Sequence, residues 1–294
     1  MMLEIKNLTK TFGSFRALDD LSLNVPKGAV YGLVGPNGAG KTTAIRHITG
    51  IYRPDSGSVQ LDGEDIFENI HAKARMGFIP DDLFFFNGAS ILDMKKYYAD
   101  IYPQFDGKLF ENVGEAFDLP AKEPIKRFSK GMQKQAAFWL TISTRPEVLI
   151  LDEPVDGLDP VMRRQVWSII LSDVADRGAT VLVSSHNLRE LEDICDHVGI
   201  MNHGKMLLEK SLEDMQGATS KVQLVGDIPE GLDILHRSDS GRLTTLVVRS
   251  PAQELQQKLQ LANLTYFDVL PLSLEEIFIY ELGGVDYEIK NIVL

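Results

Sequence analysis

The alternation of apolar and polar positions divides the first two thirds of the chain into three stretches. Residues 3–75 alternate short strand-like runs with polar turns, as at 54–57 and 62–65. Residues from about 83 to 145 change to helix-like spacing. Residues 146 to about 210 return to alternating strands and helices, with buried strands expected at 148–151 and 180–183. The pattern predicts an α/β domain with a helical insertion.

The last part of the chain has a different pattern. Strands are predicted at 222–225, 246–248 and 266–270. Pro251 can begin a helix whose apolar positions are Leu255, Leu259 and Leu261. Ser273 and Glu276 have the spacing of a capping box that would open a helix at 277–280. We expect residues 219–294 to form a small α+β accessory domain, after a large domain of residues 1–215.

A glycine-rich motif at residues 35–42 follows a predicted buried strand at 30–34 and precedes a predicted helix. It fits the pattern G-x-x-x-x-G-K-[ST], in which backbone N–H groups close around phosphate oxygens. The lysine of this pattern reaches the β- and γ-phosphates and the following hydroxyl binds Mg²⁺. The predicted nucleotide-binding residues here are Gly35, Pro36, Asn37, Gly38, Ala39, Gly40, Lys41, Thr42 and Thr43.

Two acidic residues come directly after the apolar run at 148–151. Strand ends of this kind form the ligand-binding edge of open α/β sheets. Asp152 is predicted to hold Mg²⁺, directly or through water, together with Thr42. Glu153 is the candidate base that orients and deprotonates an attacking water molecule. The two motifs together indicate a P-loop nucleoside triphosphatase.

Four further short motifs occur in a fixed order around these sites. They are the run 128–133 (F-S-K-G-M-Q), the run 156–160 (D-G-L-D-P), Ser185-His186 and the aromatic Phe12. In this order they resemble the signature motif, D-loop, switch histidine and adenine-stacking aromatic of ATP-binding cassette (ABC) ATPases. The resemblance covers residues 3 to about 215. It implies an ABC cassette fold, with an antiparallel subdomain, a mixed core sheet and an α-helical subdomain at about 83–145.

The resemblance also implies roles for individual residues. Phe12 would stack on adenine, and His186 would contact the γ-phosphate and act with Glu153 and Lys41 in catalysis. Ser129 and Gly131 open a predicted helix whose N-terminus attracts anions, so the chain has a second phosphate-binding surface. In the family this surface meets the P-loop of a second copy in a head-to-tail homodimer that encloses two ATP molecules. Asp159 would link the two sites across that dimer.

Three positions depart from the family pattern. Asp81 stands where the family has the Q-loop glutamine, and would add a carboxylate near Mg²⁺ and ATP. We expect Asp81 still to couple the nucleotide site to a partner. Lys130 replaces the first signature glycine; it can add charge near the partner's nucleotide or face water. Met132 replaces the signature glutamine.

Aromatic residues cluster after the Q-loop segment. The run 83–86 (L-F-F-F) either lines a groove that receives a short helix of a membrane protein, as the resemblance implies, or packs in the core. A second group has helical spacing and is predicted to be core: Tyr97, Tyr98, Ile101, Tyr102 and Phe105.

Composition and charge narrow the class of protein. The chain has 294 residues, 44 % hydrophobic and 24 % charged, as in an ordinary globular protein. No segment approaches the roughly 18 consecutive apolar residues of a membrane span, and the N-terminus is not that of a signal peptide. The net charge of −12 disfavours general binding of nucleic acid. Cys195 is the single cysteine and is predicted to be buried on an amphipathic helix. We expect a cytoplasmic protein that is peripheral on the inner face of the membrane.

The resemblance extends to the ATPases of bacterial drug and antimicrobial-peptide exporters, in which a separate gene encodes the permease. The residues that carry it are the variant signature at 129–132, the switch sequence 184–186 and the C-terminal extension. It implies a homodimer that hydrolyses ATP with Mg²⁺ and drives export by a polytopic transmembrane permease. Peptide or lipophilic drug cargo is expected. Two alternatives stay open: a soluble ABC ATPase acting on ribosomes or nucleic acid, and an importer ATPase.

Overall fold

The computed structural model describes residues 1–214, 219–262, 264–270, 272–273 and 276. Its contacts divide the chain into two compact units, each described here by itself. The first comprises residues 1–186 and 199–209, and the second residues 187–198 and 210–294. No helix within the described part of the chain combines the length and the apolar character that crossing a bilayer requires.

The central sheet of the first unit carries the predicted buried strands. Its strand order is β10-β9-β3-β8-β7-β6, and β3, β8, β7 and β6 are parallel. These four parallel strands are mostly apolar and almost wholly buried, as expected for a parallel sheet covered on both faces. The bounds are β3 Val30–Val34, β6 Met76–Ile79, β7 Val148–Asp152, β8 Thr180–Ser185, β9 His197–Asn202 and β10 Lys205–Ser211.

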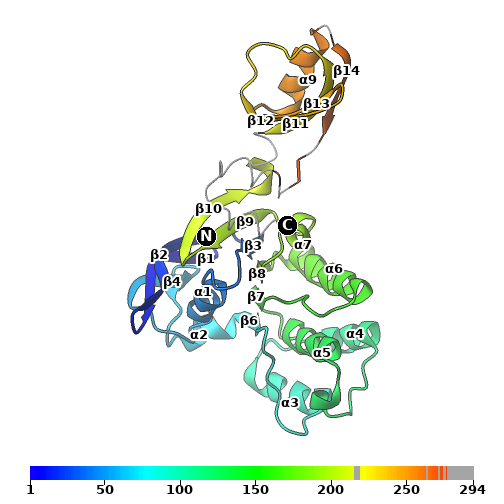
Figure 1. Ribbon diagram of the computed structural model, residues 1–294. Helices are drawn as coiled ribbons and strands as arrows, with labels where there is room; N and C mark the ends of the chain where they lie inside the picture. Colours follow the sequence, from blue (N-terminus) through cyan, green and yellow to red (C-terminus); the bar gives the residue numbers. More distant parts are fainter. Residues whose placement is uncertain (215–218, 263, 271, 274–275, 277–294) are drawn as a thin grey trace. The chain divides into compact units, whose positions relative to one another are not determined.

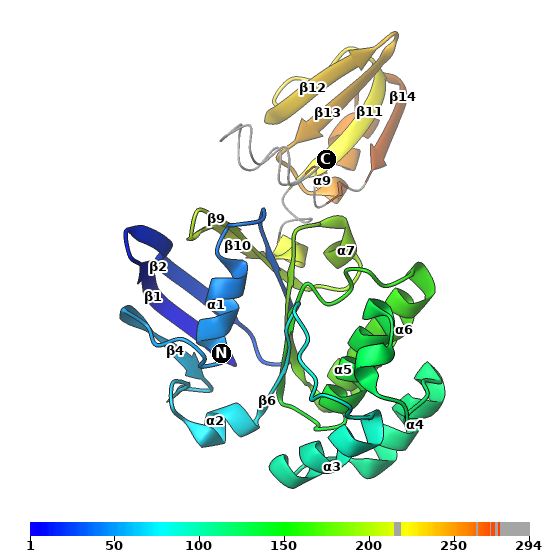
Figure 2. The same cartoon turned by 60° about the horizontal axis from the view of Figure 1, so that its bottom comes forward.

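A second, antiparallel sheet packs over one face of the central sheet with helix α1 (Lys41–Ile48) between the two (Figure 2). Its order is β2-β1-β4-β5, with β1 Leu3–Phe12, β2 Phe15–Val25, β4 Ser56–Leu61 and β5 Glu64–Asp65. Helix α2 (Ile70–Ala74) follows β5. Ala44, Ile45 and Ile48 of α1 join side chains of both sheets in one buried core. This packing fixes the start of α1 beside the end of β3.

Helices occupy the stretch in which the sequence changes to helical spacing. They are α3 Ile91–Ile101, α4 Gly107–Phe117, the 3₁₀ turn η1 Ile125–Arg127 and α5 Lys130–Ile142. Gly114 of α4 lies against Trp139 of α5, and a Cβ atom there would be 2.2 Å from the indole ring. Trp139 stacks on Phe110 and donates its indole N–H to the Phe110 carbonyl at 2.6 Å. These contacts hold α4 against α5, the helix that enters the functional site.

Helix α6 (Pro160–Arg177) follows the end of β7 and is capped at both ends. Asp159 Oδ1 accepts from the N–H groups of Val161 and Met162, and Pro160 occupies the first helical position. Gly178 ends the helix in a left-handed conformation. Helices α5 and α6 lie on the side of the central sheet opposite α1 (Figures 1 and 2).

The described part of the second unit contains an antiparallel sheet of order β12-β13-β11-β14 and helix α9. Val222, Leu224, Leu246, Leu255 and Leu259 form part of its buried core. Helix α9 ends at Gln260, so Leu261 is 91 % exposed and does not belong to the apolar face predicted for it. The bounds are β11 Ser220–Gly226, β12 Ile234–Ser240, β13 Leu243–Val248, α9 Ala252–Gln260 and β14 Leu264–Leu270.

Two other predictions in the second unit have different outcomes. Ser273 and Glu276 form the reciprocal contacts of a capping box, whereas the helix predicted at 277–280 lies outside the described residues. Cys195 is buried as predicted, but it lies after helix α7 (Arg189–Glu192) and the turn that follows it, and is not on a helix. Burial raises the pKa of its thiol well above the ordinary range.

The aromatic residues after β6 are more exposed than a core assignment requires. Phe85 is buried, whereas Phe84 and Phe86 are exposed. Tyr97 and Ile101 are also exposed, so the prediction that they belong to the core is wrong. They lie on the outer side of α3, whose buried residues are Ile91 and Met94. Helical spacing alone does not identify which side of a helix meets its neighbours.

Candidate functional site

The loop between β3 and α1 has the geometry that phosphate binding requires. Gly38 and Gly40 have φ values of 85° and 104°, which residues with a Cβ atom seldom adopt. A Cβ atom on Gly40 would also lie 2.9 Å from the Ala17 carbonyl. No side chain caps the start of α1, so its first N–H groups point into the loop. The loop therefore forms an anion site from backbone alone.

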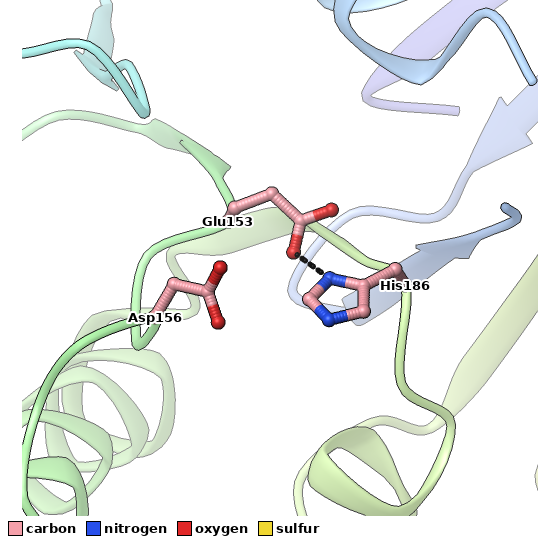
Figure 3. A group of neighbouring side chains, drawn as sticks. All are labelled: Glu153, Asp156 and His186. Atoms are coloured by element: carbon pink, nitrogen blue, oxygen red, sulfur yellow. Dashed lines mark hydrogen bonds and ion pairs between the residues drawn. The ribbon is translucent and has the colours of Figure 1, made fainter. Parts of the chain in front are cut away.

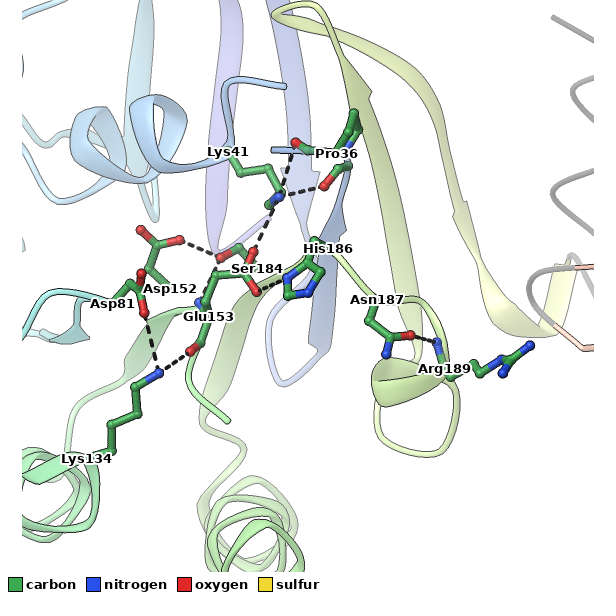
Figure 4. Close-up of polar contacts among 11 residues, drawn as sticks. Pro36, Lys41, Asp81, Lys134, Asp152, Glu153, Ser184, His186, Asn187 and Arg189 are labelled. Atoms are coloured by element: carbon green, nitrogen blue, oxygen red, sulfur yellow. Dashed lines mark hydrogen bonds and ion pairs between the residues drawn. The ribbon is translucent and has the colours of Figure 1, made fainter. Parts of the chain in front are cut away.

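Lys41, the first residue of α1, lies inside this loop and is 6 % exposed. Its ammonium donates to the Gly35 carbonyl at 2.6 Å and lies 3.4 Å from Glu153 Oε1 (Figure 4). A buried ammonium needs such partners because its desolvation is costly. Lys41 thereby joins the phosphate loop to the end of β7.

A cavity of about 290 Å³ opens beside the loop. It brings together the loop, Asp81 from the segment after β6 and Glu153 from the end of β7, although these segments are far apart in the sequence. The lining residues are Phe15, Ala17, Pro36, Asn37, Gly38, Ala39, Gly40, Lys41, Thr42, Thr43, Asp81 and Glu153.

The aromatic contact predicted for adenine has two candidates in the structure. Phe12 and Phe15 are cross-strand partners at the end of the β1–β2 hairpin, and both are exposed. Phe12 packs edge-on against Tyr52 at a centroid distance of 5.6 Å. Phe15 lines the cavity, whereas Phe12 is not among its lining residues. Phe15 is thus a candidate that the motif comparison did not select.

Asp152, the last residue of β7, is 2 % exposed and is not among the lining residues of this cavity. The Ser184 hydroxyl donates to its Oδ1 at 2.6 Å. The remaining carboxylate oxygen, the Thr42 hydroxyl and the exposed carboxylate of Asp81 are oxygen donors of the kind that Mg²⁺ prefers. The donor set therefore fits Mg²⁺ held directly or through water.

Glu153 follows β7 and has contacts at both its carboxylate and its backbone. Its Oε1 faces Lys41, and its Oε2 lies 2.9 Å from His186 Nδ1 (Figure 4). The backbone φ is +47°, in the left-handed region that residues other than glycine seldom adopt. The structure thus places the predicted base, the loop lysine and the predicted switch histidine in direct contact.

Glu153, Asp156 and His186 offer ligand atoms that all lie within 4.8 Å of one another (Figure 3). Asp156 and His186 are exposed, and Glu153 is half-buried. An imidazole is a poorer ligand for Mg²⁺ than carboxylate or hydroxyl oxygen. This group therefore fits Mg²⁺ less well than the oxygen donors of Thr42, Asp152 and Asp81.

Asp81 contacts a residue that the sequence did not single out. Lys134 of α5 is 7 % exposed, and its ammonium lies 3.4 Å from Asp81 Oδ1. The same ammonium donates to the Glu153 carbonyl at 2.8 Å. A lysine in the middle of a helix rich in apolar residues gives no local sign of such contacts. Its burial is visible only after α5 has packed.

Ser129, Gly131 and Asp159 lie elsewhere on the first unit. Ser129 caps α5 by accepting from the Met132 N–H at 3.3 Å, and Asp159 caps α6. None of the three is among the lining residues of the cavity beside the phosphate loop. Lys130 borders a separate cavity of about 440 Å³, together with Asp81, Gln133, Lys134, Asp156 and Gly157. The two predicted anion surfaces therefore do not meet within one chain.

The comparison with protein families finds a match to the ABC transporter model over residues 18–156. The ABC transporter ATP-binding protein YtrB of Bacillus subtilis is 29 % identical, over 96 % of this chain and 99 % of YtrB. The bacitracin transport ATP-binding protein BcrA of Bacillus licheniformis is 34 % identical, over 75 % of this chain and 73 % of BcrA.

Solved structures give the same result. An ATP-binding subunit of an ABC transporter superposes with a TM-score of 0.68 and 26 % identity, over 74 % of this chain and 92 % of that one. A dimeric bacterial ABC transporter cassette shares the fold, with a TM-score of 0.65 and 21 % identity over 72 % of this chain and 99 % of that one. The sequence motifs, the meeting of the phosphate loop, Asp81 and Glu153 at one cavity, and these relatives agree: the chain belongs to the ABC transporter family of ATPases and is the ATP-binding subunit of a bacterial ABC transporter.

Proposed function

We propose that this ATPase works as a homodimer that drives export through a separate transmembrane permease, on the inner face of the cell membrane. The expected cargo is an antimicrobial peptide or a lipophilic drug. Support for a peptide cargo comes from BcrA, a relative named for bacitracin transport. Support for export comes from the motifs that resemble exporter ATPases.

The observation that carries the proposal of a permease partner is an aromatic surface directly after the Asp81 segment. This aromatic surface consists of Phe84, Phe86 and Tyr97, with exposed fractions of 77 %, 46 % and 46 %. Their rings meet edge to face, with centroids 6.0 Å and 5.3 Å apart. Exposed aromatic clusters of this kind are frequent anchors of protein interfaces. A permease segment bound here would contact Phe84 and Phe86, which follow the nucleotide-site residue Asp81 closely in the sequence.

The homodimer is proposed because each chain has two separate anion surfaces. The phosphate loop forms one, and the N-terminus of α5 at Ser129 forms the other. Since they do not share a cavity in one chain, a second copy is needed to bring a Ser129 surface to each phosphate loop. The cassette of the same fold mentioned above is itself dimeric.

The site residues divide the work of ATP hydrolysis among them. Lys41 and the loop N–H groups bind the phosphates, and Thr42, Asp152 and Asp81 would hold Mg²⁺. This ion supplies charge neutralisation for the phosphate oxygens when bound. Glu153 accepts a proton from the water that attacks the γ-phosphorus, which yields ADP and inorganic phosphate. His186 orients the Glu153 carboxylate and contacts the γ-phosphate.

Replacing Glu153 by Gln tests the assignment of the base. The amide cannot accept the proton at neutral pH, so kcat is expected to fall by roughly a hundredfold or more. ATP binding should persist, because the loop and Lys41 are unchanged. The measurement is steady-state phosphate release together with equilibrium binding of ATP. Near-normal turnover of Glu153→Gln would remove Glu153 as the base.

A pull-down experiment tests the transporter role. The Glu153→Gln chain, in Mg²⁺ and ATP, is expected to retain a polytopic membrane protein from gently solubilised native cells. The double change Phe84→Ser and Phe86→Ser in this background should lose that protein while ATP binding is kept. Ile70→Ser is the matched control, because Ile70 is 80 % exposed at the start of α2, outside the aromatic surface.

The pull-down also decides between the alternatives. Ribosomes, nucleic acid or only soluble proteins among the captured partners would contradict the transporter role and favour a soluble ABC ATPase. Capture of a permease together with a substrate-binding protein would favour an importer.

A further inference from the structure

The backbone at Glu153 is held in an uncommon conformation by contacts on both sides. Its N–H donates to Ser184 Oγ at 3.1 Å, and its carbonyl accepts from Lys134 Nζ at 2.8 Å. With φ at +47°, this residue depends on its surroundings to keep its conformation. A change in φ or ψ at Glu153 would move the carboxylate, because the side chain projects from the Cα atom that joins the two peptide planes.

Lys134 is the contact that comes from the helical segment. It lies in the middle of α5, 19 residues before Glu153, and its whole side chain is buried. Ser184, by contrast, belongs to β8, which pairs directly with β7. The contact from Lys134 thus joins the helical segment to the end of β7, whereas that from Ser184 joins neighbouring strands.

Asp81 fixes the other side of the same ammonium. Its Oδ1 lies 3.4 Å from Lys134 Nζ, 53 residues away in the sequence. The Asp81 side chain is 56 % exposed and lines the cavities on both sides, beside the phosphate loop and beside Lys130. One ammonium therefore connects the segment after β6 to the backbone of the predicted base (Figure 4).

We propose that Lys134 is a positioning residue for hydrolysis: it holds the Glu153 carbonyl so that the carboxylate points at the water that attacks ATP, and Asp81 sets the position of its ammonium. The inference rests on the proposed role of Glu153 as the base. Misplacing a catalytic group by about 1 Å can cost on the order of a hundredfold in rate. Loss of the Lys134 contact should therefore affect the chemical step more than nucleotide binding.

The test compares Lys134→Met and Lys134→Arg in the full chain. Methionine retains a long side chain that packs but donates no hydrogen bond, whereas arginine keeps the charge and the N–H donors. We expect Lys134→Met to lower kcat by roughly tenfold to a hundredfold while KM for ATP changes by less than about twofold. Lys134→Arg should recover most of the lost kcat. Lys108→Met, on the exposed side of α4, is the control and should behave as wild type.

Three results would overturn the proposal. They are an unchanged kcat in Lys134→Met, a rise in KM that matches the loss in kcat, and a Lys134→Arg chain as slow as Lys134→Met. Thermal unfolding and ATP binding of each variant identify a chain that has merely failed to fold. In that event Lys134→Arg alone decides, since a positioning role requires near-normal turnover from it.

A second comparison tests the link to Asp81. At saturating Mg²⁺, Asp81→Asn should lower kcat by a smaller factor in the Lys134→Met chain than in the wild type, because its effect on the Glu153 backbone passes through Lys134 whereas its contribution to Mg²⁺ binding does not. An equal factor in both chains would refute that link. The Glu153→Gln chain distinguishes a failure of the base assignment from a failure of the role proposed for Lys134. If it hydrolyses ATP normally, the base assignment fails, and if it is inactive while Lys134→Met is normal, only the present inference fails.

Discussion

The phosphate loop and helix α5 each supply a buried lysine to the same glutamate. Lys41 is 6 % exposed and faces the Glu153 carboxylate, whereas Lys134 is 7 % exposed and donates to the Glu153 carbonyl. Both have a second partner near the cavity: Lys41 the Gly35 carbonyl and Lys134 the carboxylate of Asp81. The two residues are alike in burial and charge but contact opposite ends of one residue.

The difference separates binding from positioning. Lys41 lines the cavity beside the phosphate loop, where it can reach phosphate oxygens. Lys134 lines the cavity beside Lys130 and reaches the first cavity only through Glu153 and Asp81. Two equally buried lysines can therefore have different functions, which depend on what each ammonium touches.

The largest expected effect is the loss of ATP affinity in Lys41→Met, which tests whether Lys41 binds phosphate and so differs from Lys134. Removing a charged donor to the phosphates should weaken ATP binding by about tenfold to a hundredfold, since hydrogen bonds to charged groups contribute roughly 1.5–3 kcal/mol. Hydrolysis should be lost at ordinary ATP concentrations. Equilibrium binding of ATP measures the effect, with Lys108→Met as the control. An unchanged affinity would mean that the two lysines do not differ as stated.

A smaller effect is expected from Ser184→Ala, which removes the other backbone contact of Glu153. Its hydroxyl accepts from the Glu153 N–H and donates to Asp152. The bond from the Glu153 N–H is neutral and the bond to the Asp152 carboxylate is charge-assisted, so their loss should lower kcat by about tenfold, in the same sense as Lys134→Met. The measurement is kcat for ATP hydrolysis at saturating Mg²⁺. Ser143→Ala is the matched control, because Ser143 is also buried but its hydroxyl donates to the Trp139 carbonyl at the end of α5, away from Glu153.

If Ser184→Ala leaves kcat unchanged while Lys134→Met lowers it, the conformation of Glu153 depends on the helical segment alone. If both lower kcat equally, the strained peptide needs support from both sides.

The smallest expected effect is a pH dependence of the free energy of unfolding that arises from α1 and not from α5. Burial is the main influence that lowers the pKa of the His47 imidazole in α1, opposed by its contact with the Thr43 carbonyl and reinforced by the nearby Lys10. Helix α5 has no histidine. Below the unfolded value of about 6.5, the unfolded chain binds a proton more readily than the folded chain. The free energy of unfolding should therefore decrease as the pH falls below about 6.5, and this group should have no effect well above it.

The variant His47→Asn is expected to lose less stability than wild type between pH 7.5 and pH 5. Denaturant midpoints at the two pH values measure this, and His71→Asn, an exposed histidine on α2, should follow wild type. If the denaturant midpoint of His47→Asn depends on pH as that of the wild type does, a group other than His47 causes the loss of stability at low pH.

The sequence was sufficient for much of the fold and for the family. The buried strands at 30–34, 148–151 and 180–183 occur where the continuous apolar runs predicted them. Side-chain exposure was less predictable: Tyr97, Ile101 and Leu261 are apolar by composition but face solvent. Which side of a helix is covered depends on the neighbours that pack against it, and these come from other parts of the chain.

The phosphate loop could be identified from eight consecutive residues because its chemistry is local. Gly38, Gly40 and the start of α1 form an anion site from their own backbone, so residue order alone determines it. The ends of β7 and β8 were also predictable, since parallel strands bring their carboxyl ends to one edge. Lys41, Asp152, Glu153 and His186 could therefore be named before any tertiary contact was known.

Lys134, Ser184 and Phe15 could not be selected in this way. Lys134 has partners 19 and 53 residues away, and nothing in its neighbours along α5 distinguishes it from a solvated lysine. The left-handed backbone conformation of Glu153 was likewise not predictable, because this position has no glycine to indicate it. Only the packing of α5 against the ends of β6 and β7 buries the ammonium and supplies its acceptors. The sequence determined which groups bind the phosphates, and the tertiary structure decided what holds the base in place, because a buried charge acquires its partners only when distant segments meet.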